Sequence, residues 1–241
     1  MKYLLYCVLR SLPRPELEGL TGVAGMAVRV IDHGGLSAAA SELKGPDAPP
    51  DVAAVLAYAS VVEALFNRQT IIPLRYGCTV RDRAELAALF DEHRQQCETL
   101  LDGLEGLAEM GIQVPASDDA SETDAAIVSP PPLPESNRSG VSYLLAKKLY
   151  YSGADRMAER HNELVTSLCQ PLAGLFVRRK VELPSRGAPL LSLYFLVPRT
   201  SVDCFRGASR QCLNNAPAGP LVSGPWPPYN FVDFSNIKEI S

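Results

Sequence analysis

The sequence predicts an α+β protein built from two domains. Three observations lead to this expectation. Stretches with the two-residue period of a β-strand occur in both halves of the chain, apolar stripes with helical spacing lie between them, and 241 residues match two domains of ordinary size. We place the domains at residues 1–107 and 108–231, followed by a tail at 232–241. The apolar content of 46% is sufficient for two folded cores.

The first domain is expected to begin with two strands. Residues 2–9 form an apolar run, and Arg10 and Pro13 follow it without the small-residue cleavage site of a signal peptide. A buried first strand is therefore the better interpretation. Residues 23–32 alternate between the two faces of a second strand.

Two helices with a strand between them are expected next. Asp51 is a good N-cap for the first helix. Its apolar stripe comprises Val52, Val55, Leu56, Ala59, Val62 and Phe66. Residues 70–77 form a short strand, which Pro73 restricts to a sheet edge or a bulge. Asp82 and Glu85 resemble a capping box at the start of the second helix. Its apolar seam comprises Leu86, Phe90, His93, Cys97, Leu100, Leu104 and Leu107.

The second half has the element order strand, helix, strand, strand, helix, strand. This is the order of a ferredoxin-like unit. The expected strands are residues 109–114, 174–183, 190–197 and 220–223, and the expected helices begin at Ser139 and Ser201. The stretch 115–139 is rich in proline, serine and acidic residues, so we expect a flexible insert there.

Composition narrows the classes of function. No apolar run reaches the roughly 18 residues needed to cross a membrane. The six cysteines form no C-x-x-C pair, which argues against a zinc knuckle or a disulfide framework and favours small buried side chains. Acidic residues dominate 1–137 and basic residues dominate 138–241. Because acids interrupt the basic side chains, we expect electrostatic matching between the halves or with a protein partner rather than with nucleic acid.

Residues that could carry chemistry have ordinary structural interpretations. His93, with Cys97 one turn later, and His161 could supply metal ligands. They lie in apolar stripes, however, where a hydrogen-bonded core histidine is commoner. The glycine-rich stretch 19–25 precedes a strand, whereas a phosphate-binding loop follows one.

Two carboxylates lie beside apolar residues. Glu63 or Glu109 could be buried against a partner such as Arg75, and a structural ion pair is commoner there than a catalytic acid. No G-x-S-x-G, H-E-x-x-H or P-loop lysine signature is present. We therefore predict no catalytic residues, no metal site and no cofactor.

The most distinctive stretch is residues 224–231, which contain three prolines, three aromatic residues and the only tryptophan. Proline fixes φ and removes a backbone donor, so this stretch cannot continue as a helix or a central strand. A stiff segment of this kind either closes its own domain or presents Trp226 and Tyr229 as anchors for a partner. The sequence leaves both interpretations open.

Several stretches, in this order, resemble the gas vesicle protein F/L family. They are residues 61–65 with 72–78, then 109–114, 139–144 and 223–231. The resemblance implies two α+β domains, the second a modified ferredoxin-like unit. It also implies a non-enzymatic accessory or minor structural protein that supports gas vesicle assembly, and hence the buoyancy of the cell. The motif residues are Arg75, Gly77, Gly224, Pro225, Trp226, Pro227, Pro228, Tyr229 and Phe231.

The same resemblance implies the partners and the location. The partners would be the very apolar major shell protein and other gas vesicle accessory proteins, and not nucleic acid or a membrane. The location would be the cytoplasm and the gas vesicle. The alternative is a small α+β enzyme or ligand-binding module that uses the ferredoxin-like sheet. That alternative needs a converging polar cluster, which the sequence does not reveal.

Overall fold

The structure is a computed structural model that describes residues 1–11, 19–43, 45, 51–115, 159, 162–185, 190–213 and 220–232. The chain divides into two compact units. The first comprises Met1–Glu109, Leu196–Arg199 and Gly224–Ser241, and the second comprises Met110–Phe195 and Thr200–Ser223. The division after Glu109 lies two residues beyond the expected boundary. The chain then returns to the first unit twice, at Leu196–Arg199 and from Gly224 onward.

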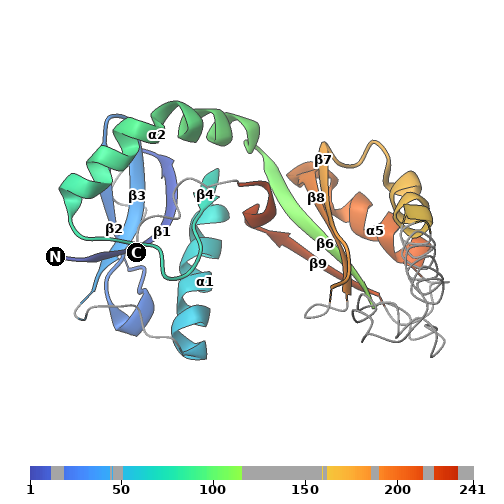
Figure 1. Cartoon of the computed structure of the whole chain (residues 1–241), viewed down its shortest axis with the longest axis horizontal. Helices are drawn as coiled ribbons and strands as arrows, with labels where there is room; N and C mark the ends of the chain where they lie inside the picture. The colour runs from blue at the N-terminus through green and yellow to red at the C-terminus, as the bar shows by residue number, and fades with distance from the viewer. Residues whose placement is uncertain are drawn as a thin grey trace, which may run out of the picture. The chain divides into compact units, whose positions relative to one another are not determined.

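The first unit contains an antiparallel sheet in the order β2-β3-β1-β4, with β5 also paired to β1 (Figure 1). Its strands are β1 (Tyr3–Arg10), β2 (Arg29–His33), β3 (Leu36–Glu42), β4 (Ile71–Pro73) and β5 (Thr79–Val80). Six consecutive residues of β1 are buried. Because successive side chains point to opposite faces, both faces of this strand are covered.

Strand β3 is missing from the sequence-based prediction. Its residues are mostly alanine and serine, which have low strand propensity, yet it pairs with β1 on one side and β2 on the other. All but the last of its residues are buried. The buried Ser41 hydroxyl lies 3.0 Å from Tyr6 Oη, and Ser37 Oγ donates a 2.5 Å hydrogen bond to Asp32 Oδ1.

The strand expected at residues 23–32 is wrong over its first half. Val23–Gly25 form a short 3-10 helix, η2, in which Ala24 has φ 54° and Gly25 has φ 72°. These left-handed values are incompatible with a strand, so β2 begins only at Arg29.

Helix α1 (Val52–Phe66) begins where it is expected, because Asp51 Oδ1 accepts a 2.7 Å hydrogen bond from the Ala54 N–H. The face predicted to be buried is wrong over the first two turns. Val52, Val55, Leu56 and Ala59 are exposed. The residues that are buried are Ala54, Tyr58, Val61, Val62, Leu65 and Phe66. The helix is apolar on nearly every side, so its periodicity does not identify the face that packs on the sheet.

Helix α2 (Arg83–Gly103) agrees better with the prediction. Asp82 Oδ1 accepts a 2.9 Å hydrogen bond from the Glu85 N–H. Glu85 closes the cap one residue earlier than a standard capping box, since its carboxylate accepts the N–H of Arg81 at 2.5 Å. The buried seam comprises Leu86, Phe90, Cys97, Leu101 and Leu104. Leu101 thus replaces the predicted Leu100, and Leu107 already belongs to β6.

The second sheet has the order β7-β8-β6-β9 (Figure 1). Its strands are β6 (Leu107–Pro115), β7 (Arg178–Glu182), β8 (Leu190–Pro198) and β9 (Leu221–Trp226). Residues 162–169 are helical, and helix α5 (Val202–Leu213) lies between β8 and β9 in the chain. In the core of the second unit, the centroid of the Phe195 ring lies 5.0 Å from that of Phe176 and 5.2 Å from that of Phe205.

Three predictions fall largely on residues outside the described part of the chain. They are the flexible insert at 115–139, the start of the helix at Ser139 with His161, and the tail beyond residue 232.

Candidate functional site

The proline–aromatic segment, residues 224–231, extends from the end of β9 into a short 3-10 helix, η6 (Tyr229–Phe231). The peptide bond between Gly224 and Pro225 is cis, and Gly224 has φ 104°. β9 ends the strand order of its sheet, and Pro225 fits there because an edge strand tolerates the loss of one backbone donor.

The segment divides into a buried part and an exposed part. Pro227, Pro228 and Phe231 are buried, whereas Trp226 is 47% exposed. Closing the domain, one of the two interpretations left open by the sequence, therefore suits only the buried residues of the segment. The prolines and Phe231 close the first unit, and Trp226 is not a core residue.

Buried Glu109 on β6 holds the segment through two hydrogen bonds from Asn230. The Asn230 N–H donates to Glu109 Oε2 at 2.8 Å, and Asn230 Nδ2 donates to Oε1 at 2.7 Å. The prediction that one of the two carboxylates is buried is thus confirmed for Glu109, whereas Arg75 as its partner is wrong. Glu63 and Arg75 are both exposed, and neutral amide donors satisfy the carboxylate of Glu109.

A cluster of phenols lies behind the segment in the first unit. Tyr58 stacks on Tyr6 with ring centroids 4.9 Å apart. Its hydroxyl lies 2.9 Å from the carbonyl oxygens of both Leu5 and Leu74, either of which can accept its hydrogen. Burial, followed by the nearby Cys7 and Glu109, raises the pKa of Tyr229 to about 12. Burial and then Tyr229 raise the pKa of Tyr58 well above its usual value. Both phenols therefore stay protonated at neutral pH.

The other predicted motif residues, Arg75 and Gly77, lie in the turn between β4 and β5. The Cys78 N–H donates to the Arg75 carbonyl oxygen at 3.2 Å, which closes a tight turn. Gly77 has φ 92°, a left-handed conformation that side chains other than glycine rarely adopt. The glycine is explained by this turn geometry.

The suspected metal ligands lie in different surroundings. Cys97 is buried, and burial raises the pKa of its thiol to about 11, so the metal-binding thiolate is disfavoured. His93 is partly buried beside it in the chain, and His161 lies outside the described residues. Within the described residues, no three His, Cys, Asp or Glu side chains gather into a possible metal site. Cys204 is exposed, unlike the buried cysteines that the sequence predicts.

A cavity of about 820 Å³ lies along strand β2 and was not predicted. Its lining includes both successive residues Val30 and Ile31 on β2, and Leu86 and Ala87 on α2. The glycine-rich stretch 19–25 forms part of another wall. The Gly34-Gly35 turn is the only feature of the sequence that could point to this cavity. The cavity lies at the edge of the sheet, and that edge cannot be located unless β3 is recognised as a strand.

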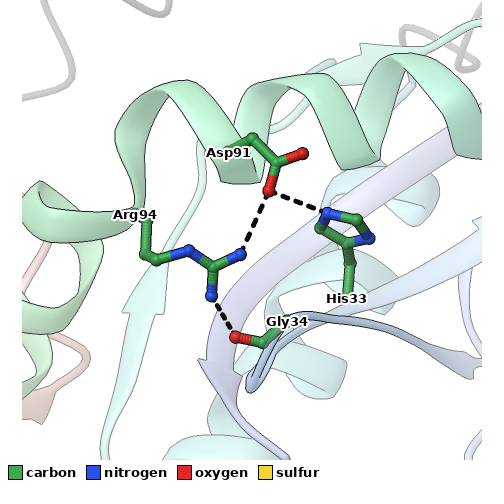
Figure 2. A network of polar contacts seen from close by, with 4 residues as sticks. All are labelled: His33, Gly34, Asp91 and Arg94. Atoms are coloured by element: carbon green, nitrogen blue, oxygen red, sulfur yellow. Dashed lines mark hydrogen bonds and ion pairs between the residues drawn. The ribbon is translucent and has the colours of Figure 1, made fainter.

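A polar network fixes one end of β2 to α2 (Figure 2). His33 Nε2 lies 2.9 Å from Asp91 Oδ1, and Arg94 Nη2 donates to the same oxygen at 3.1 Å. The other guanidinium nitrogen of Arg94 donates to the Gly34 carbonyl oxygen. The hydrogen bond from His33 and then that from Arg94 lower the pKa of Asp91.

Comparison with known proteins identifies the family of this chain. Residues 2–233 match the family described as gas vesicle synthesis protein GvpL/GvpF. The chain belongs to this family. It is 25% identical over 219 residues to gas vesicle protein F2 of Halobacterium salinarum, covering 88% of this chain and 83% of that protein. It is 27% identical over 255 residues to gas vesicle protein L of a Streptomyces species, covering 94% and 91%.

Solved structures of GvpF have the same fold as this GvpL/GvpF chain. The crystal structure of GvpF from Anabaena sp. PCC7120 aligns with a TM-score of 0.75 and 18% identity, over 96% of each chain. GvpF from Microcystis aeruginosa aligns with a TM-score of 0.76 and 17% identity, over 95% of this chain and 98% of that one. Of the helices within the described residues, none combines the length and the apolar character that a bilayer crossing requires.

Proposed function

We propose that this chain is a non-enzymatic gas vesicle accessory or minor structural protein that binds the major shell protein and supports gas vesicle assembly. Membership of the GvpL/GvpF family supports the accessory role. The proposal places the protein in the cytoplasm and at the gas vesicle, with no bound cofactor. Its contribution to buoyancy would follow from assembly of the shell.

The exposed Trp226 is the observation that best supports binding of an apolar partner. Buried Pro227 and Pro228 follow it directly, and Asn230 is tied to Glu109. The backbone that carries the indole is therefore fixed before any partner arrives. A preorganised aromatic anchor loses little entropy on binding, which is why such residues dominate many interfaces.

The strand order supports a ferredoxin-like second unit. Numbered along the unit, β6, β7, β8 and β9 lie in the order 2-3-1-4, with helical segments after the first and third strands.

Replacing the tryptophan tests the proposed function. In cells that co-express the tagged chain and the major shell protein, Trp226→Ala should reduce the co-purified shell protein by about tenfold or more. Its melting temperature should stay close to that of the wild type, because the side chain is half exposed.

Leu221→Ala is the matched control, since Leu221 is 58% exposed on the same strand and lies outside the proline–aromatic segment. It should leave shell-protein retention unchanged. Undiminished retention with Trp226→Ala, or a large loss of stability, would contradict the role of the indole as an anchor. No retention by the wild type would contradict binding of the shell protein altogether.

A further inference from the structure

One further strand could pair along the outer edge of β2, and part of that edge is already paired. Beside the chain just before β2, this position is occupied, because Thr21 pairs with Ala27 and the Val28 N–H donates to the Leu20 carbonyl oxygen at 3.1 Å. Alongside Arg29–His33 no strand of the described residues follows, and β2 ends the strand order. A further strand would continue the line that Leu20 and Thr21 begin.

The backbone groups that face this open position can be assigned. In an antiparallel ladder, hydrogen bonding to one neighbour alternates residue by residue. The Val28 N–H faces outward, towards Leu20, so the same alternation turns the N–H and C=O groups of Val30 and Asp32 outward. Ile31 and His33 face β3, as expected for a hairpin closed by the two-residue turn Gly34-Gly35.

The cavity follows this same edge. Successive residues of β2, such as Val30 and Ile31, point to opposite faces of the sheet, and both line the cavity. The cavity therefore runs along the edge of the strand rather than over one face. Leu20 and Val28 lie on one side, and Leu86 and Ala87 of α2 add further apolar lining. An incoming strand would find both hydrogen-bonding groups and apolar contacts for its side chains.

The charges at the cavity are unequal. Arg29 and Arg83 line it, and no carboxylate within the described residues forms an ion pair with either. Asp32 also lines the cavity, next to His33, and accepts a hydrogen bond from Ser37. His33 and Arg94 share Asp91 at the same end. Arg83 lies eight residues before Asp91, or about 12 Å along α2. The cavity is thus positive at the end away from His33.

We propose that the edge of β2 binds an extended segment of a partner protein by strand addition. The segment would have apolar side chains facing the cavity and a carboxylate near Arg29 and Arg83. This inference rests on the proposed function, under which the segment belongs to the major shell protein. Strand addition draws its affinity from main-chain hydrogen bonds and its specificity from side-chain pockets, and the β2 edge supplies both. A small molecule would leave the repeated outward backbone groups unused.

Two variants of the edge test the proposal by different routes. Val30→Pro removes an outward N–H without removing a bond to β3, and an edge strand accepts proline. Ala87→Arg fills the cavity from the side of α2, where Ala87 is partly buried. Ala88→Arg is the matched control, because the neighbouring Ala88 is exposed and does not line the cavity.

The measurement is retention of co-expressed major shell protein by the full-length tagged chain, with the melting temperature of each variant as a check on folding. Val30→Pro and Ala87→Arg should each reduce retention by about tenfold, whereas Ala88→Arg should retain as much as the wild type. Hydrogen exchange on the complex should show slower exchange at the Val30 and Asp32 amides than in the free chain.

Charge reversal supplies a third arm. Arg29→Glu combined with Arg83→Glu should lower retention, whereas Arg68→Glu, at an exposed site away from the cavity, should not. The effect of the double reversal should shrink as the salt concentration rises, because the charges are exposed.

The outcomes separate this inference from the proposed function. If the wild type retains the shell protein and both Val30→Pro and Ala87→Arg retain it equally, strand addition at β2 is wrong and the proposed function stands. If Ala87→Arg alone reduces retention and the two amides do not slow, the occupant is not a strand and the inference is also wrong. If the wild type retains no shell protein, both proposals fail.

Discussion

The two long helices of the first unit begin in the same way, but the exposed face of α2 is charged and that of α1 is apolar. Both α1 and α2 start at an aspartate whose carboxylate accepts a backbone N–H three residues later. The outer face of α2 carries charged side chains, including Asp91 and Glu92. Helix α1 contains a single formally charged residue, Glu63, and exposes Val52 and Leu56 to 76% and 61%.

The difference shows what a sequence pattern can decide. In α2 the polar residues mark the outer face, so the apolar period identifies the buried one. In α1 nearly every position is apolar, and the sheet selects the face that contains Tyr58 and Val62. In α1, therefore, residue type does not indicate which residues are buried. The helix keeps an exposed apolar face after the first unit has folded.

Truncating one leucine on each helix tests this comparison with the largest expected effect. Leu101→Ala on α2 should lower the free energy of unfolding by about 2–5 kcal/mol, because Leu101 is fully buried and its loss leaves a cavity. Leu56→Ala on α1 should change it by less than about 0.5 kcal/mol. Chemical denaturation of both variants measures the difference. Equal losses would show that Leu56 is packed and would remove the contrast between the helices.

The N-caps provide the next test, in which the helices should behave alike. Asp51→Ala and Asp82→Ala should each cost about 1 kcal/mol in denaturant unfolding, because each leaves an N–H of the first turn without its side-chain acceptor. Asp51→Asn and Asp82→Asn are the controls, since asparagine retains the capping oxygen. If the asparagine variants lose as much as the alanine variants, the carboxylate contributes through its charge rather than through capping.

Most of the elements were predictable because local chemistry determines them. Asp51 and Asp82 set the starts of the helices, and Pro73 correctly indicated an edge strand. β3 was missed because its alanines and serines signal a strand only through their neighbours β1 and β2. The η2 turn was missed because Ala24 adopts a left-handed conformation that no alternation pattern reveals.

The candidate sites depend on contacts between distant parts of the chain. Glu109 was singled out as a buried acid, but its partner Asn230 lies 121 residues away, so the sequence could not pair them. The segment containing Trp226 was recognised from its composition, whereas its division into buried prolines and an exposed indole depends on packing. Predicting the cavity along β2 would require knowing both that β3 is a strand and where α2 packs.

Acidification tests the charged face of α2, which α1 lacks, and should give the smallest effect. The His33 and Arg94 contacts lower the pKa of Asp91 in the folded state below its unfolded value of about 3.9. The stabilisation is therefore present above about pH 4 and disappears as the pH falls through the lower folded pKa. Asp91→Asn should remove this part of the acid dependence of the melting temperature. Because Asp91 is exposed, about 1 M salt should weaken the same effect in the wild type, and an unchanged acid profile in Asp91→Asn would show that the network in Figure 2 does not contribute to stability.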